Sequence, residues 1–433
     1  MNELQHLKRL SALRSGTGIK FLTPAVSPGS HCPMRIASVN VENISGLSSL
    51  LVGMPECTTY SRLFNPKPEG RNGELHWLYV LDANEVVFGC RAGLTAALKK
   101  MVRAGAKAIM LIITCVPELI GEDIEGILEE MRPELTVPVT FVMLGQFKNT
   151  SYPSGSWKTM EAIGTLMKVQ ETDCRRINVL GRSPIEKHIP LSPLLPALER
   201  HGLSLRCLAP GASLEEFQSA PDAALNIVVS PFMEPLAAKM ERQFGIPYIA
   251  LHTHYAVEAI DRVYAALAQR FNFSWGDEFA ESRRQALTLQ REAQNRLQGL
   301  RFVFSLRIDI ALPLAVYLAT LGMEPLLLHL EEFYPEDRAY AEKLTAMGHN
   351  PWICRMTNEA ADLPLLEKLA PDICFGYLPE LSGAIPCVPE MLDFYGQTGY
   401  DRTGSLLSRI LGVLDKLNNM SVKGGPAYGT ASL

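Results

Sequence analysis

The stretch KAIMLIITCVPELIGEDIEGILEEM, residues 107–131, contains the pattern that decides the fold. Its first part, residues 107–114, is a continuous apolar run of the kind that is typical of a buried parallel strand. An amphipathic helix is predicted to follow, as far as about Arg132. Cys115 stands between the two, and acidic residues crowd the start of the helix. The stretch therefore predicts a strand followed by a helix, with a thiol at the carboxyl end of the strand.

The same alternation of strand and helix continues on both sides of this stretch. Before it, residues 77–88 are interpreted as a strand and a turn, and residues 90–105 have helical spacing, with Gly105 suited to a helix C-cap. After it, residues 137–144 are another apolar strand. Alternating strands and helices indicate right-handed βαβ units and a parallel sheet.

The pattern then restarts twice along the chain. Further strands are predicted at residues 176–181, 224–230, 246–251, 301–306, 324–330, 351–357 and 372–377, and helices at 191–203, 233–245, 274–300, 309–322, 336–348 and 359–370. A chain of 433 residues is too long for one ordinary core. We predict three doubly wound, Rossmann-like α/β domains, covering residues 1–170, 171–285 and 286–433. Ligands in such folds bind beyond the carboxyl ends of the strands.

Composition excludes several classes of protein. A net charge of −5 gives no basic footprint for nucleic acid. No apolar run reaches the ~18 residues that a membrane-spanning helix needs, and residues 1–18 lack the apolar core of a signal peptide. We therefore expect a cytoplasmic protein with neither a nucleic-acid nor a membrane partner. Disulfides are rare in that compartment, so the nine cysteines favour a metal or redox role for some of them.

Several catalytic and nucleotide-binding motifs do not occur in the chain. There is no G-x-x-x-x-G-K-S/T loop, and residues 155–159, GSWKT, lack its glycine spacing. Neither H-E-x-x-H nor G-x-S-x-G is present. We therefore expect that the chain binds no ATP and that its histidines are structural. The sequence assigns no catalytic residue.

Three cysteines in the first third of the chain share one local context. Each lies beside a proline and at or near the start of a predicted helix: Cys32 with Pro33, Cys57 with Pro55, and Cys115 with Pro117. A helix entrance lowers the pKa of a thiol, and thiolates are the ligands that an iron–sulfur cluster requires. The pattern alone leaves two interpretations open, a metal site and small buried apolar side chains.

Six segments along nearly the whole chain resemble the nitrogenase component 1 family of iron–sulfur reductases. ITCVPELIGEDI is similar to the family's TTCxxELIGDDI, GMPEC to its GPxGC, VFGCRAGL to its VFGG segment, NTSYPSGSWKTMEAIG to its TPSFxGSHxTG, MERQFGIPYI to its MEEKYGIPW, and GYDRTGSLLSRI to its GYDG helix. The resemblance implies three Rossmann-like domains around a central cavity. It also implies that the first domain holds an iron–sulfur cluster at a subunit interface.

The resemblance identifies Cys32, Cys57 and Cys115 as the ligands of that interface cluster. Three thiolates leave a 4Fe–4S cluster one ligand short, so a homologous second component 1 subunit or a second copy of the chain must supply the fourth. Alternatively, two such triads share a larger, P-cluster-like 8Fe–7S cluster. Either arrangement predicts an oligomer. A heterotetramer of two homologous subunits is expected first, and a homodimer is the alternative.

The chain also departs from the family at particular positions. The α subunit of nitrogenase holds its active-site cofactor with a cysteine upstream of MEEKYGIPW and a histidine upstream of GYDG; here Val229, Ser230 and Thr398 stand instead. A nitrogenase-type cofactor bound in that manner is therefore not expected. Cys90 replaces a family glycine and is expected to be a packed residue at a helix start. Cys374 and Cys387 are left either packed or facing the cavity.

Two functions follow from the resemblance. In the first, the chain is a subunit of a nitrogenase-like oxidoreductase. An ATP-dependent partner similar to the nitrogenase iron protein delivers electrons, and the interface cluster passes them to a substrate that the sequence does not name. In the second, the chain is a scaffold subunit for assembly of a metallocofactor. A third possibility, kept as a control, is a redox-inert Rossmann-like binding module. Finding iron and sulfide in the protein would exclude it.

Overall fold

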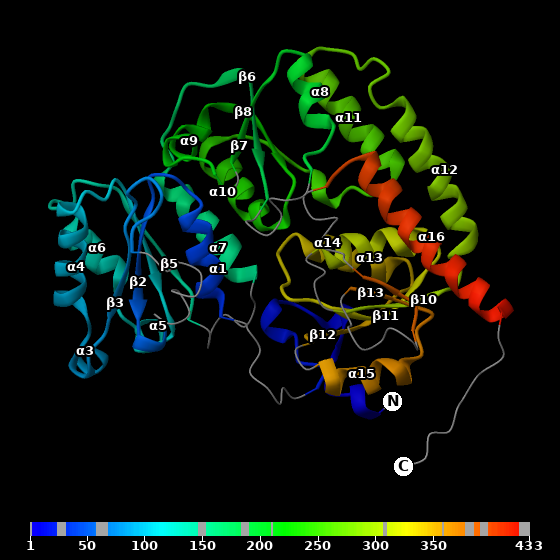
Figure 1. The fold of residues 1–433 in the computed structure, drawn as a ribbon, viewed down its shortest axis with the longest axis horizontal. Coiled ribbons are helices and arrows are strands. Elements are labelled where there is room, and N and C mark those ends of the chain that lie inside the picture. Colours follow the sequence, from blue (N-terminus) through cyan, green and yellow to red (C-terminus); the bar gives the residue numbers. More distant parts are fainter. Residues whose placement is uncertain are drawn as a thin grey trace. The chain divides into compact units, whose positions relative to one another are not determined.

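The computed structural model describes residues 2–23, 32–57, 68–145, 153–182, 190–208, 211–305, 310–356, 359–376, 385–389 and 397–423. The chain divides into two compact units. We call residues 30–252 the cysteine unit, and residues 1–29 with 253–433 the terminal unit. Among the described residues the cysteine unit contains two parallel sheets and the terminal unit contains one (Figure 1). The predicted fold class, Rossmann-like α/β, is confirmed, whereas the predicted boundaries at residues 170 and 285 stay a prediction.

The first sheet of the cysteine unit has the strand order β3-β2-β4-β5, with all its pairs parallel. Its strands are β2 (Ser48–Gly53), β3 (His76–Val80), β4 (Ile109–Ile113) and β5 (Val139–Met143). The helices around it are α1 (Pro33–Glu42), α3 (Ala83–Phe88), α4 (Arg91–Arg103), α5 (Cys115–Leu119), α6 (Ile124–Met131) and α7 (Pro153–Ile163). The chain leaves β2 for β3 on one side and later returns to β4 on the other. The topological switch point therefore lies between β2 and β4.

The apolar stretch that opened the sequence analysis forms the centre of this sheet. All five residues of β4 are buried, and they alternate between two cores. Met110 and Ile112 belong to the core shared with α1 and α7, whereas Ile109, Leu111 and Ile113 belong to the core shared with α4 and α6. A strand covered by helices on both faces needs apolar side chains at every position. This is why the run in the sequence is continuous.

Strand β2 was not predicted from the sequence, and two further local details differ from the predictions. The helix expected after β4 is two helices, α5 and α6, because Gly121 adopts a φ of +77° between them and Asp123 caps α6 by accepting a hydrogen bond from the Gly126 N–H at 2.9 Å. The turn expected before residue 88 is a helix, α3, which starts with a capping box formed by Asp82 and Glu85. The helix expected over residues 90–105 is α4, followed by Gly105 at a φ of +98°.

The second sheet of the cysteine unit has the order β7-β6-β8-β9, again fully parallel. Its strands are β6 (Asp173–Leu180), β7 (Ser204–Leu208), β8 (Ala223–Val228) and β9 (Tyr248–Ala250), and its helices include α8 (Leu194–Arg200), α9 (Leu214–Ser219) and α10 (Glu234–Phe244). Strand β7 was not predicted from the sequence. One apolar core joins this sheet to α1 and α7 of the first sheet.

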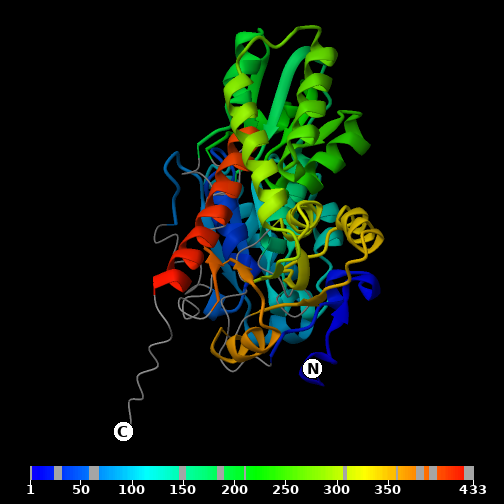
Figure 2. The same ribbon diagram turned by 90° about the vertical axis from the view of Figure 1, so that its right-hand side faces the viewer.

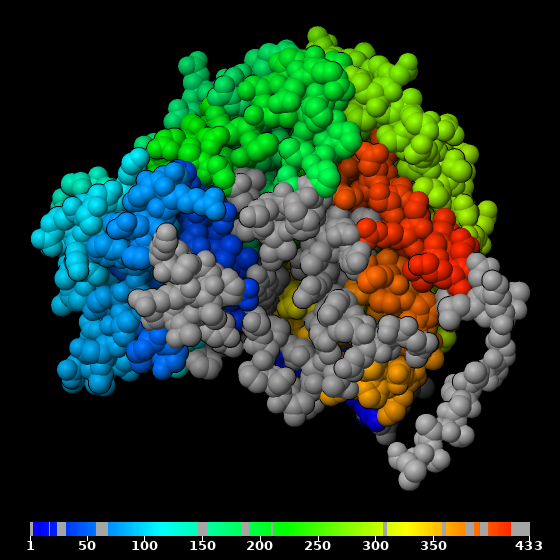
Figure 3. Space-filling model, viewed as in Figure 1, coloured from blue at the N-terminus to red at the C-terminus, as the bar shows by residue number. Residues whose placement is uncertain are grey.

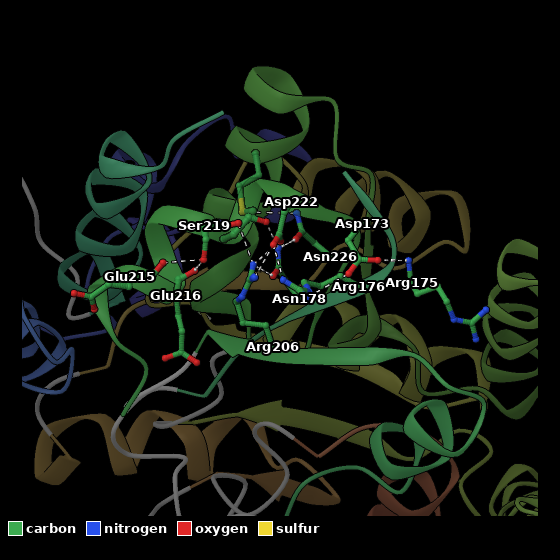
Figure 4. A network of polar contacts seen from close by, with 12 residues as sticks. Asp173, Arg175, Arg176, Asn178, Arg206, Glu215, Glu216, Ser219, Asp222 and Asn226 are labelled. Carbon is green, nitrogen blue, oxygen red and sulfur yellow. Dashed lines mark hydrogen bonds and ion pairs between the residues drawn. The ribbon is translucent and has the colours of Figure 1, made fainter. Parts of the chain in front are cut away.

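A polar network holds three strands of the second sheet together (Figure 4). Asp222 accepts hydrogen bonds from Arg206 at 2.7 and 2.8 Å and from Arg176 at 2.6 Å. Beside them the buried Asn178 donates to Asn226 at 2.9 Å. Burial opposes ionisation of Asp222, but the hydrogen bonds and charges of the two arginines hold its pKa below the ordinary value. Each of these charged groups has an opposite charge beside it within the unit.

The sheet of the terminal unit has the order β1-β12-β11-β10-β13-β14, in which only the pair formed by β1 is antiparallel. Its strands are β1 (Lys8–Arg9), β10 (Arg301–Phe304), β11 (Glu324–His329), β12 (Trp352–Cys354), β13 (Ile373–Phe375) and β14 (Cys387–Val388). Its helices are α11 (Val257–Phe271), α12 (Ala280–Arg296), α13 (Ala311–Thr320), α14 (Asp337–Ala346), α15 (Glu359–Leu369) and α16 (Tyr400–Lys423). Strands β1 and β14 and helix α11 were not predicted from the sequence.

The C-terminal motif GYDRTG begins α16. Its side chains fix this end of the helix to the segment just before α11. Arg402 is fully buried, lies over the ring of Tyr255 at 3.9 Å and donates to the carbonyl of His254. Thr403 donates to the carbonyl of Tyr255 at 2.6 Å. Helices α12 and α16 run side by side (Figures 1 and 2), and part of α16, red in Figure 3, lies at the molecular surface. No helix among the described residues is long and apolar enough to cross a membrane.

Candidate functional site

The three predicted cysteines meet at the carboxyl edge of the first sheet. Cys57 lies four residues beyond the end of β2, in a helical turn at residues 55–57, and Cys115 is the first residue of α5, directly beyond β4. Cys32 is the N-cap residue of α1, which packs along β2 and β4. Because β2 and β4 are parallel neighbours, their carboxyl ends lie together at the switch point of the sheet. The fold therefore brings to one place three cysteines that are far apart in sequence.

The electrostatics of Cys32 reflect this proximity. Burial raises the pKa of the Cys32 thiol, and the nearby Cys115 and Cys57 raise it further, while backbone N–H groups at the start of α1 oppose the rise. All three side chains are half-buried and none forms a disulfide. A thiol whose ionisation is disfavoured by its surroundings is stabilised as a thiolate when it binds a cationic metal centre. The donor chemistry of the site therefore fits an iron–sulfur cluster.

Thr114 and Gly53 position the thiol of Cys57. The Thr114 hydroxyl donates to the carbonyl of Val52 at 2.8 Å and accepts from Cys57 Sγ at 3.7 Å. A Cβ atom added at Gly53 would lie 2.3 Å from Thr114 Oγ1 and 3.1 Å from Cys57 Sγ. A side chain at position 53 would therefore displace the thiol. The sequence analysis did not identify either residue, because their roles depend on contact between two strands.

The first turn of α1, beside Cys32, is positioned by α7. A Cβ atom added at Gly155 would lie 2.0 Å from the carbonyl oxygen of Pro33, so the two helices approach more closely than any side chain at 155 would allow. Asn40 donates to Ser156 Oγ at 3.1 Å further along the same contact. The segment GSWKT, which lacks the spacing of a phosphate-binding loop, is thus a helix that holds Cys32 in place.

The acidic residues after Cys115 have structural partners. Glu118 is buried and accepts a hydrogen bond from the backbone N–H of Gly145, just beyond β5. Glu122 accepts from the backbone N–H of Cys90 at 2.8 Å, and Asp123 caps α6. These contacts tie α5 to both neighbouring loops. Glu118, Glu122 and Asp123 therefore have a structural role.

Cys90 does not belong with the three predicted ligands. Its side chain is fully buried in the core formed with α4 and α6, whereas Cys32 and Cys57 pack against the core on the other face of the sheet. Burial, helped by the charge of Glu122, raises the pKa of Cys90 to about 12. It stands at the N-cap of α4, as a packed residue at a helix start. No three His, Cys, Asp or Glu side chains in the described part of the chain, Cys32, Cys57 and Cys115 included, are grouped closely enough to hold a single metal ion.

Large apolar side chains are exposed around the same edge of the sheet. Val87 and Phe88, at the end of α3, are 70% and 84% exposed, and Leu119 and Ile120, after Cys115, are 62% and 40% exposed. Helices α3 and α5 follow the carboxyl ends of β3 and β4 (Figure 1). Exposed large apolar side chains are common where a protein contacts another protein. We call these four residues the apolar rim.

The positions that depart from the nitrogenase α subunit are packed. Val229 and Ser230 follow β8 at the switch point of the second sheet, and both are buried. A Cβ atom added at Gly181, beyond β6, would lie 2.0 Å from Val229 Cγ2. Thr398, in the terminal unit, is also buried. Apolar or hydroxyl side chains thus occupy these places.

The chain matches a known protein family and several curated proteins in sequence. A family model described as nitrogenase component 1 type oxidoreductase matches residues 32–415. The nitrogenase iron-molybdenum cofactor biosynthesis protein NifE of Nostoc sp. (strain PCC 7120) is 27% identical over 238 residues, which cover 52% of this chain and 48% of that protein. NifE of Clostridium pasteurianum is 26% identical over 284 residues, covering 62% and 60%. The chain thus spans about half the length of the curated relatives it matches.

Solved structures show the same fold. The structure "Nitrogenase Cp1 at pH 6.5" aligns with a TM-score of 0.70 and 16% sequence identity, over 95% of this chain and 97% of that one. A second structure, "Nitrogenase Cp1 at pH 5", aligns with a TM-score of 0.62 and 18% identity. These structural similarities show the fold only. The family model shows which family the chain is related to. The chain belongs to the nitrogenase component 1 type oxidoreductase family.

Proposed function

We propose that this chain is a scaffold subunit on which a metallocofactor is assembled, and that Cys32, Cys57 and Cys115 hold an iron–sulfur cluster at an interface with another subunit. The observation that carries the proposal is the convergence of three half-buried thiols at one edge of the first sheet. Two curated relatives are named as cofactor biosynthesis proteins, which favours assembly over substrate turnover. The buried Val229 and Ser230, where the nitrogenase α subunit has a cofactor cysteine, agree with a chain that does not retain such a cofactor in that manner.

Ligand number is the reason for the second subunit. A 4Fe–4S cluster takes four thiolates, and the site offers three. The remaining cysteine of the first sheet, Cys90, lies in the core on the opposite face. A homologous component 1 subunit, or a second copy of this chain, would supply the missing ligand or a second triad. The apolar rim would be buried in such contacts, which also exclude water from the cluster.

The chain's own residues have defined tasks in this scheme. The three thiolates bind iron, Thr114 and Gly53 set the position of the Cys57 sulfur, and α7 sets the position of Cys32. The cluster, when bound, supplies one-electron redox chemistry. Backbone N–H groups at the start of α1 would stabilise the Cys32 thiolate in the bound state, since they already oppose the rise in its pKa that burial causes.

A nitrogenase-like oxidoreductase subunit is the second candidate, and the family model, which describes an oxidoreductase type, favours it. In this scheme an electron-delivering partner would dock on the apolar rim, of which Phe88, at 84%, is the most exposed residue. The chain contains no phosphate-binding loop, so an ATPase resembling the nitrogenase iron protein would have to couple ATP hydrolysis to electron delivery. Both candidates use the same three cysteines.

One experiment separates the two functions. The chain is purified without oxygen together with the products of neighbouring genes, and its iron, sulfide and other metals are quantified. The complex is then mixed with a cofactor-free acceptor protein, or with the ATPase partner, Mg-ATP and a reductant. A scaffold loses its metal stoichiometrically to the acceptor, whereas an oxidoreductase keeps its metal and consumes reductant over many turnovers. A complex that contains neither iron nor sulfide would overturn both proposals.

A further inference from the structure

Two cysteines of the terminal unit lie directly opposite each other on neighbouring strands. Cys374 in β13 and Cys387 in β14 are register partners in a parallel pair. The strands are held together at this point by Cys374 N–H donating to the carbonyl of Pro386 at 2.7 Å and Gly376 N–H donating to that of Val388 at 3.1 Å. Adjacent strands are about 4.8 Å apart, which lies within the Cα separation that a disulfide spans. Both side chains leave the sheet on the same face, because directly paired residues do so.

The two sulfur atoms differ in access. Cys374 is fully buried, in an apolar core that includes Val303 and Leu327, whereas Cys387 is half-buried. The neighbouring Cys374 thiol lowers the pKa of Cys387, whereas Cys387 and burial raise the pKa of Cys374 well above its ordinary value. Cys387 Sγ donates to the carbonyl of Gly376 at 3.3 Å, and Cys374 Sγ donates to that of Phe375 at 3.8 Å. One thiol is therefore partly accessible, and the other is shielded beside it.

From this geometry we infer that Cys374 and Cys387 form a reversible dithiol–disulfide pair in which Cys387 reacts first and Cys374 resolves. The oxidant is a low-molecular-weight disulfide of the glutathione class. The Cys387 thiolate attacks one sulfur of that disulfide, so a mixed disulfide forms and one thiolate leaves. Cys374 then gives up its proton and attacks Cys387 Sγ, which forms the bond between the two cysteines and releases the second thiolate. Overall the two cysteines lose two electrons and two protons, and one disulfide becomes two thiols.

The pairing distinguishes these cysteines from the other buried thiol of the same sheet. Cys354 ends β12 and is registered with His329 of β11, so the residue opposite it on that strand carries no sulfur. Burial raises its pKa well above the ordinary value, and the charge of Asp362 adds to this rise. Cys354 should stay reduced under conditions that oxidise the pair. It provides a matched internal control, and the inference is independent of the proposed cluster function.

The test uses the full chain, purified without oxygen and incubated with oxidised glutathione. Remaining thiols are alkylated, and the digest is mapped by mass spectrometry. We expect a peptide pair joined through Cys374 and Cys387, which dithiothreitol reverses, and an alkylated Cys354. In Cys374→Ser the glutathione adduct on Cys387 should persist, and in Cys387→Ser no adduct should form on Cys374.

Two results would overturn the inference. Alkylation of both Cys374 and Cys387 after prolonged oxidation would show that the pair does not react. A stable glutathione adduct on Cys387 of the wild-type chain would show that Cys374 does not resolve it. Neither result depends on whether a serine variant folds, because both are read from the wild-type chain.

Discussion

The carboxyl edge of the first sheet and the Asp222 network of the second sheet lie in the same unit but satisfy their polar groups differently. Asp222 forms ion pairs with Arg176 and Arg206 of its own chain, and these contacts hold neighbouring strands together. Cys32, Cys57 and Cys115 are half-buried thiols near one edge of the first sheet, where Cys57 and Cys115 disfavour ionisation of Cys32. A region whose charges are paired internally contributes to folding. A region that gathers ionisable thiols and leaves apolar side chains exposed is suited to bind a cofactor or a partner protein.

Replacing the cysteines should have the largest effect. Cys32→Ala, Cys57→Ala and Cys115→Ala should each lose most of the bound iron, because a cluster with two thiolates from this chain is no longer held. Iron and acid-labile sulfide per chain, after purification without oxygen, measure this. Cys174→Ala changes an exposed cysteine of the second sheet and should keep its iron. Full iron retention in all three variants would refute the assignment.

Removing the carboxylate of Asp222 should lower the free energy of unfolding without lowering the iron content. Asp222→Ala leaves Arg206 without its partner in a nearly buried site, so the free energy of unfolding should fall by about 2–4 kcal/mol. Chemical denaturation of the metal-free chain provides the value. Asp173→Ala removes a more exposed partner of Arg176 and should cost at most about 1 kcal/mol. Iron per folded chain should not change in either variant. A selective loss of iron in Asp222→Ala would contradict the assignment of this network to folding alone.

A methyl group at Gly53 tests the geometry of the site without removing a ligand. Gly53→Ala places a Cβ against Thr114 and Cys57, and the local rearrangement should cost about 1–3 kcal/mol and reduce iron content in part. Gly412→Ala, where an added Cβ meets nothing within 4 Å, is the matched control. Unfolding curves and iron analysis of both variants are compared. Equal iron content in the two would mean that the position of the Cys57 sulfur is not set by Gly53.

The smallest expected effect is a dependence of the free energy of unfolding on pH. The pKa of Asp222 is lower in the folded chain than the value of about 3.9 expected when unfolded. Its ion pairs therefore stabilise the fold fully above the unfolded value, and the contribution is lost as the pH falls through the folded one. The stability difference between wild type and Asp222→Asn should shrink between about pH 5 and pH 3. A difference that stays constant over this range would show that the charge of Asp222 does not matter.

Sequence patterns anticipated the elements that depend on local signals. The apolar run of β4 and the glycine that ends α4 were identified because burial on both faces and a positive φ leave direct traces in the sequence. The resemblance to a known family, together with the prolines beside the cysteines, identified the three thiols. Their convergence at one sheet edge then follows from the parallel strand order.

Features that depend on contact between distant segments were not predictable in this way. Strand β1, two residues long, pairs with β12, more than three hundred residues later, and such a short edge strand has no periodicity of its own. The opposition of Cys374 and Cys387 depends on strand register, which spacing in sequence does not reveal. The need for glycine at positions 53 and 155 likewise becomes visible only when the neighbouring strand and helix are in place.

The central claim is that the three cysteines complete a cluster only together with another chain. Native mass spectrometry of the complex, purified without oxygen from its own operon, tests it directly. We predict that the cluster mass is found on species containing two chains, either this chain with a homologue or two copies of it, and that monomers of this chain lack it. A monomer that carries a complete iron–sulfur cluster would contradict the account.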